Sequence, residues 1–168
     1  MFERGEAYGD YQTSSAYLAN GVPLVENGQA VPWMTWGALD DNGNVVRDPT
    51  FPDMPSFKEV CEATAGCETS GEAWEAWKAF MIAGFPAQKM IFLPKGAPQE
   101  AIDTFSAALD AVLARDDFAE ISAARLGVYP QMTGAAAQGT LQLGTQVADE
   151  AKAFVIDWLA EDYGVRLN

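Results

Sequence analysis

The chain has 168 residues, 49% hydrophobic and 11% aromatic, so it carries enough apolar material for a core, which argues against wholesale disorder. Its 24 acidic and 10 basic residues give a formal charge of −14, which repels phosphate backbones and anionic lipid heads. We therefore expect one domain, or two small lobes sharing a short connection, with no nucleic-acid or membrane-surface partner.

The N-terminal sequence and the hydropathy pattern bear on localisation. No stretch approaches the roughly 20 continuous apolar residues that a bilayer span needs. Residues 1–6 lack a basic start followed by an apolar run, so no signal peptide is expected. The chain is thus expected to be cytoplasmic, or to have lost a leader or an upstream segment.

The first 40 residues predict one helix and one strand. Residues 3–19 are typical of a weak helix, which Asn20 and Gly21 would end. Residues 30–39 are rich in aromatic and β-branched side chains, and they predict a strand despite Pro32 near its start.

Residues 40–44 read DDNGN, which allows a calcium loop or a tight turn. A calcium-binding EF-hand loop needs glycine at its sixth position and glutamate at its twelfth. Here Gly43 is fourth when counting begins at Asp40, and no glutamate follows at the twelfth position. Because Asn-Gly is also favoured in tight turns, we predict a turn.

Two helices are expected next. Ser56 can cap a helix over residues 57–65 that Gly66 ends, and residues 69–72 (TSGE) form a capping box for a second helix. On the second helix, Trp74, Trp77 and Met81 recur at helical spacing, which favours a core face over a ligand cage.

The C-terminal half predicts one strand and three helices. Residues 89–93 are a short apolar run typical of a buried strand, and residues 94–98 form the loop that leaves it. The helices are expected from Pro98 to Ala114, from about Asp117 to Gly127, and from Thr133 to Gly164. The apolar face of the first of them comprises Ile102, Phe105, Leu109 and Val112. Helices that alternate with short strands predict an α/β layer architecture.

The two cysteines, Cys61 and Cys67, leave two interpretations open. The chain has no histidine, and a lone C-x5-C pair is a weak zinc site because zinc normally takes four Cys or His ligands. A local disulfide and two buried thiols both remain. We expect no metal and no cofactor.

Catalytic chemistry finds little support. Without histidine a Ser-His nucleophile is excluded. Lys58 lies three residues before Cys61 on the same predicted helix face, where a lysine could activate the thiol. An ordinary surface lysine explains this position better. The carboxylate pairs Asp116–Asp117 and Glu161–Asp162 lie near helix ends, where acids act as caps or solvated charges. No G-x-G-x-x-G or Walker-type loop occurs. We expect a protein that is not an enzyme.

Four segments in order resemble one protein family, the substrate-binding proteins of tripartite tricarboxylate transporters. Residues 52–59 (PDMPSFKE) resemble the family's P-D-x-P-[ST]-x-x-E segment, and residues 91–98 (IFLPKGAP) resemble its strand and P-x-G-x-P loop. Residues 116–118 (DDF) and 126–130 (LGVYP) resemble its D-P-x-[FV] and L-G-x-x-P steps. The likeness covers roughly two-thirds of the chain.

The resemblance implies a periplasmic-binding-protein-like fold of the second type. In such a fold, two lobes close around an organic acid and present the complex to a membrane permease. The chain would be a single unit, 1–168, corresponding to the C-terminal part of such a protein, with the crossing strand near residues 89–93. The resemblance also implies a periplasmic location and a ligand whose carboxylate is held largely by backbone N–H groups of loops and helix starts.

The chain departs from the family in two respects. Family members are about twice as long, begin with an export signal and carry their main ligand loops in the N-terminal part. The best candidate here for ligand binding is the turn of Lys95, Gly96 and Ala97, which leads into a helix; a plain strand-to-helix connection with a proline start is the favoured explanation of this turn.

Two functions follow as expectations. The first is a solute-binding protein for a small organic carboxylate. The second is an interaction module that binds no ligand alone and either self-associates as a homo-oligomer or pairs with a separate N-terminal half. The five tryptophans favour the second, since a surface built to be covered would otherwise be exposed.

Overall fold

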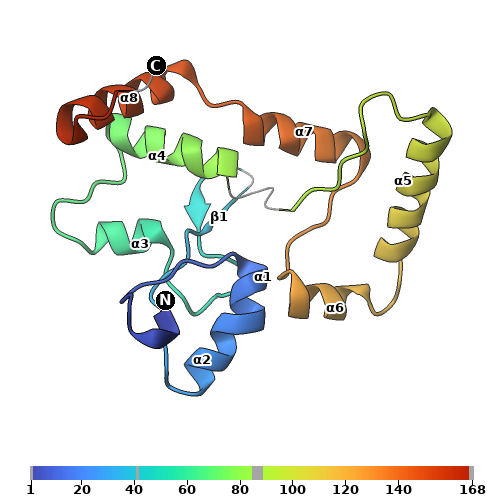
Figure 1. The fold of residues 1–168 in the computed structure, drawn as a ribbon, viewed down its shortest axis with the longest axis horizontal. Coiled ribbons are helices and arrows are strands. Elements are labelled where there is room, and N and C mark those ends of the chain that lie inside the picture. The colour runs from blue at the N-terminus through green and yellow to red at the C-terminus, as the bar shows by residue number, and fades with distance from the viewer. Residues whose placement is uncertain (1, 41, 85–88, 167–168) are drawn as a thin grey trace. The chain divides into compact units, whose positions relative to one another are not determined.

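A computed structural model describes residues 2–40, 42–84 and 89–166 (Figure 1). Its contacts group the chain into two units, whereas the family resemblance implies a single one. The first unit comprises Met1–Ser56 and Asp103–Gln131, and the second comprises Phe57–Ile102 and Met132–Asn168. The described chain is a mixed, helix-rich structure with one two-stranded sheet.

The N-terminal helix of the first unit begins and ends later than predicted. A 3-10 turn, η1 (Phe2–Arg4), precedes a helical run made of α1 (Ser14–Ala16), the π-helical η2 (Tyr17–Gly21) and α2 (Val22–Glu26). Thr13 caps its start, its hydroxyl accepting from the Ala16 N–H at 3.4 Å. The predicted stop at Gly21 is wrong: that glycine is helical and lies against the Tyr17 ring, where a Cβ would clash.

A short hairpin follows in the same unit. Strands β1 (Ala38–Leu39) and β2 (Val45–Val46) pair antiparallel, so the strand predicted over residues 30–39 is confirmed only at its end. The turn between them is as predicted: the Asp40 side chain accepts from the Asn44 N–H at 2.8 Å, and Gly43 has φ +76°. The Asp40 carboxylate thus serves the turn.

The second unit is built from helices. Its short helix α3 (Phe57–Glu62) follows Ser56, and α4 (Gly71–Gly84) contacts both α7 (Gly134–Thr145) and α8 (Asp149–Tyr163). The aromatic stripe of α4 is core, as predicted. Trp74 and Met81 are buried, and Trp77 is half-buried with its ring centroid 4.5 Å from that of Trp74.

Two predictions for the second unit are wrong. The apolar run 89–93 forms no strand, and Ile91 and Phe92 are 68% and 66% exposed. A strand needs a neighbour for its backbone groups, and this run has none among the described residues. The long helix expected from Thr133 is broken between Thr145 and Asp149, although Gly164 ends it in the left-handed conformation as expected.

The interleaved strands of the predicted α/β architecture are also missing from the described residues. Helices α5 (Gln99–Leu113) and α6 (Phe118–Arg125) lie where the sequence predicts them, but residues 128–130 between α6 and α7 form no strand. The sheet is only β1 and β2, which gives no support to a periplasmic-binding-protein-like fold. Among the described helices, none has both the length and the apolar character that a bilayer span requires.

Candidate functional site

A buried hydrogen-bond network holds distant segments of the first unit together. Asp48 is only 7% exposed, and the Tyr129 hydroxyl donates to its Oδ2 at 2.6 Å. The Ser14 Oγ lies 2.8 Å from the same Tyr129 oxygen. Because the single phenolic proton is directed to Asp48, Ser14 donates to Tyr129. Three segments of the chain therefore meet at one phenol.

Thr50 extends this network to the backbone of the segment before Tyr129. Its N–H donates to Asp48 Oδ1 at 2.8 Å, and its Oγ1 accepts from the Val128 N–H at 3.1 Å. Gly127 makes this approach possible, since it has φ +94° and a Cβ there would lie 2.6 Å from Thr50 Oγ1. The network thereby fixes residues 127–129 against residues 48–50.

The environment of Tyr129 raises the pKa of its phenol above the ordinary value of 10.0. Burial is the main cause, and the hydrogen bond to Asp48 acts in the same direction, since the phenol donates its proton there. Hydrogen bonds from Ser14 and Thr50 oppose the shift. The phenol therefore remains neutral and acts as a structural donor near neutral pH.

A cavity of about 370 Å³ lies beside this network. It is formed by the end of α5, the start of α6 and the segment that follows α6. The lining residues are Leu113, Phe118, Ala119, Ser122, Gly127, Val128, Tyr129, Pro130 and Gln131. All belong to the first unit, and none carries a formal charge at neutral pH. The lining is mainly apolar, as in most sites for small molecules.

The start of α6 brings hydrogen-bond donors to this cavity. The first N–H groups of a helix have no acceptor inside it. The N–H groups of Ala119 and Glu120 have no backbone acceptor in the described part of the chain, and Ala119 lines the cavity. Ser122 also lines it and is 6% exposed; no described side-chain oxygen is both buried and unbonded, so its hydroxyl, which makes no hydrogen bond there, is open to the cavity. These donors are available to a bound molecule.

The predicted ligand turn lies elsewhere, in the second unit. Lys95 and Gly96 are exposed, and the Ala97 N–H donates to the Pro94 carbonyl at 3.0 Å. Gly96 has φ +83°, as a tight turn requires. None of these residues lines the cavity, and the Ala97 amide already has an acceptor within the turn; ligand binding at Lys95, Gly96 and Ala97 stays a prediction.

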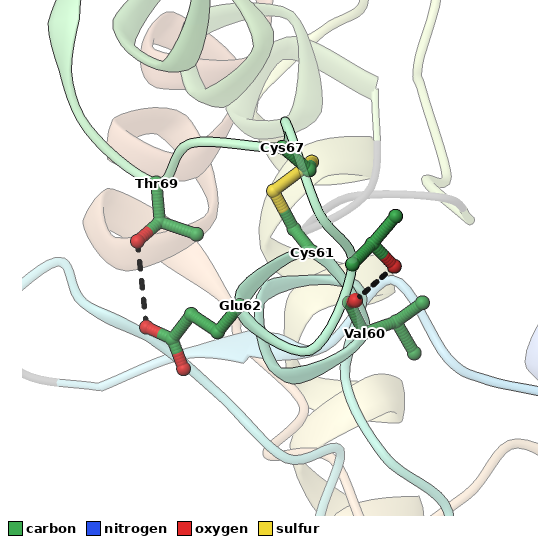
Figure 2. The surroundings of a disulfide bond; sticks show 6 residues. Val60, Cys61, Glu62, Cys67 and Thr69 are labelled. Atoms are coloured by element: carbon green, nitrogen blue, oxygen red, sulfur yellow. Dashed lines mark hydrogen bonds between the residues drawn. A yellow bond between two sulfur atoms is a disulfide. The ribbon is translucent and has the colours of Figure 1, made fainter.

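The cysteines are joined by a disulfide in the second unit, one of the two states that the sequence leaves open. Cys61 and Cys67 have an S–S distance of 2.01 Å and Cα atoms 5.1 Å apart. Figure 2 shows the bond beside the Thr69–Glu62 hydrogen bond of 3.4 Å, which also spans the loop after α3. The disulfide closes this loop. Cys61 is 2% exposed, so the bond is part of the core.

Other chemistry-bearing groups are used structurally. Arg115 forms a bidentate pair with Asp117, with distances of 2.8 and 2.6 Å, and this bond lowers the pKa of the Asp117 carboxyl. Lys58 lies 3.7 Å from Glu62 on α3. In residues 2–40, 42–84 and 89–166, no three His, Cys, Asp or Glu side chains gather as a metal site would require.

The sequence gives a partial signal for the cavity. Residues 126–130 resemble the L-G-x-x-P step noted above, and residues 127–130 line the cavity, but nothing local marks Asp48, which is 81 residues from Tyr129. No protein-family model, curated protein or solved structure matches the chain.

Proposed function

We propose that the chain is a non-catalytic protein that binds a small organic acid in the cavity of the first unit. The observation that carries the proposal is the set of unused donors at the start of α6, on the wall of an otherwise apolar cavity. Helix N-termini bind carboxylates because their free N–H groups and the helix dipole favour negative charge. Such a site needs no basic side chain, which suits a chain of charge −14.

The groups in the cavity are better suited to binding than to reaction. No His, Asp, Glu or Lys lines the cavity beside Ser122, and a serine without a base is a weak nucleophile. Tyr129 has its proton directed to Asp48. A hydroxyl that only donates or accepts a hydrogen bond positions a ligand without changing it.

The resemblance to substrate-binding proteins of tripartite tricarboxylate transporters supports the same proposal. Residues 126–130 resemble the family's L-G-x-x-P step, and residues 127–130 line the cavity. The biological role would then be delivery of an organic acid to a membrane permease, from the periplasm. The disulfide supports an oxidising compartment, where such bonds persist. The periplasmic-binding-protein-like fold is part of this proposal, and the two-stranded sheet of the described chain does not support it.

Thermal unfolding of the purified chain against a panel of mono-, di- and tricarboxylates tests the proposal. A ligand present at a hundredfold excess over its Kd stabilises the native state by about 2.7 kcal/mol, a clear rise in Tm. We expect a rise with at least one acid, and no rise when Leu113→Trp fills the cavity. A folded sample that responds to no acid would refute the proposed function.

A second candidate, self-association or pairing with a separate chain, is favoured by helix α5. Its apolar face is incompletely covered: Phe105 and Val112 are 48% and 47% exposed. Apolar faces of this kind are typical of interfaces. Sedimentation velocity tests this function: a dimer that becomes a monomer in Phe105→Glu would support it, and a monomeric wild-type chain would exclude self-association.

A further inference from the structure

The cavity beside α6 has a polar end and an apolar end, and the difference bears on which acids it accepts. This inference rests on the proposed function, because it concerns the same site. Its starting point is the number of donors that the lining offers and where along the cavity they lie.

The polar end is the start of α6. Side chains in a helix point back towards its N-terminus, so the Ser122 hydroxyl is directed towards the turn that contains Ala119. Ser122 as a residue is 6% exposed, and its hydroxyl, which makes no hydrogen bond within the described chain, is open to the cavity that it lines. Together with the N–H group of Ala119, which also lines the cavity, the Ser122 hydroxyl suits the two oxygens of one carboxylate.

The apolar end is formed by side chains that offer no hydrogen bond. Leu113 at the end of α5 and Phe118 at the start of α6 line the cavity, and Val128 lines it from the following segment. A volume of about 370 Å³ is within the usual range of small-molecule sites, roughly 300–1,000 Å³, and it leaves room for a hydrocarbon or aromatic body beyond one carboxylate.

Charge limits the ligand further. The N-terminus of a helix offers about half an elementary charge, and no lysine or arginine lines the cavity. The other polar side chains of the lining, Tyr129 and Gln131, already donate to Asp48 Oδ2 and to the Tyr129 carbonyl, so a second carboxylate would lie mainly against the apolar wall, which is costly. The net charge of −14 would also repel each added negative charge. One carboxylate is therefore the number that the lining can stabilise.

We propose that the cavity selects monocarboxylates with an apolar body, with the carboxylate at the start of α6 bonded to Ser122 and the body against Leu113, Phe118 and Val128. Di- and tricarboxylates are poor ligands of this site. The selectivity follows from the unused donors and the uncharged lining.

Isothermal titration of the full chain with benzoate, benzamide, succinate and citrate tests this proposal. We expect benzoate to bind, and benzamide, which has the same shape without the charge, to bind at least about tenfold more weakly, the equivalent of 1.4 kcal/mol. Succinate and citrate should bind more weakly than benzoate. Equal affinity for benzoate and benzamide would overturn the proposal.

The Ser122→Ala variant tests where the carboxylate lies. We expect about a tenfold loss of benzoate affinity, since a hydrogen bond to a charged group is removed. The matched control is Ser106→Ala on the exposed surface of α5, which should bind like the wild type. Unchanged benzoate binding by Ser122→Ala would overturn the placement.

The panel separates this inference from the proposed function. If succinate or citrate binds and benzoate does not, the monocarboxylate proposal fails and the organic-acid function stands. If no acid binds a folded sample, both fail.

Discussion

The two units of the chain bury different kinds of side chain. In the second unit the buried residues are apolar: Cys61, Trp74, Ala76 and Met81. In the first unit, Val45 is the apolar residue buried among the described ones, while Asp48, Ser56 and Ser122 are buried polar residues. Apolar burial is non-directional, whereas a buried polar group requires a partner at a defined distance and angle.

This contrast explains why the candidate site lies in the first unit. The directional hydrogen bond from Tyr129 to Asp48 holds the segment after α6 in place, and the cavity remains open beside this segment. In the second unit the rings of Phe57, Trp74 and Trp77 fill the space between α3 and α4, with centroids 4.5 to 6.2 Å apart. Ring packing of that kind stabilises the fold without requiring polar partners.

The largest expected effect is on the apolar core. Trp74→Ala removes a buried, stacked ring from the second unit and should lower the free energy of unfolding by about 3–5 kcal/mol. Urea unfolding followed by near-UV circular dichroism measures the loss. The control is Trp33→Ala in the first unit, 71% exposed, which should change stability by less than about 0.5 kcal/mol. Equal losses in the two variants would contradict the contrast.

Reduction of the disulfide should have the next largest effect. Opening the short loop between Cys61 and Cys67 should destabilise the second unit by about 2 kcal/mol, because the unfolded chain regains conformational freedom. Urea midpoints with and without dithiothreitol measure this. A Cys61→Ala, Cys67→Ala double variant should be insensitive to the reductant; a wild-type chain equally insensitive would show that the bridge contributes nothing.

Removing the phenolic hydroxyl tests the polar network of the first unit. Tyr129→Phe leaves Asp48 buried with one donor fewer and should cost about 1.5 kcal/mol. Hydrogen exchange at the Val128 amide, which donates to Thr50, should accelerate in this variant while exchange in α4 does not change. Tyr8→Phe, at a fully exposed tyrosine, is the control. Faster exchange in α4 alone would contradict the assignment of this network to the first unit.

Alkaline pH should give the smallest effect, confined to the first unit. Burial raises the pKa values of Tyr11, Tyr17 and Tyr129 above 10.0, and all three belong to that unit. Between the unfolded and folded pKa values the native state binds more protons, so the free energy of unfolding falls as pH rises above 10.0. Urea midpoints from about pH 9 to pH 11 should fall less steeply in Tyr129→Phe. Identical slopes would contradict a buried phenol.

Local patterns predicted the helices well and the strands poorly. The stripe of Trp74, Trp77 and Met81 and the start of α5 after Pro98 depend on residues a few positions apart, so sequence alone identifies them. The run 89–93 has the composition of a strand, yet pairing depends on a neighbour far along the chain. The helix stop at Gly21 failed because the glycine packs against Tyr17 and the helix continues past it.

The candidate site was predictable only in part. Gly127 and Tyr129 lie in a segment that the sequence marks, but the partners Ser14 and Asp48 come from distant parts of the chain. A serine in a helix carries no sign that it lines a cavity, as Ser122 does. The position of the turn at Lys95 before a helix favours it as a ligand loop, but the Ala97 amide is used within the turn itself.

A titration of the 15N-labelled chain with benzoate, followed by amide chemical shifts, tests the central claim most directly. We expect the largest shifts at the amides of Ala119 and Glu120, with smaller ones at Ser122, and none at Lys95, Gly96 or Ala97. Shifts confined to residues 95–97, or the absence of any shift at saturating benzoate, would contradict a carboxylate site at the start of α6.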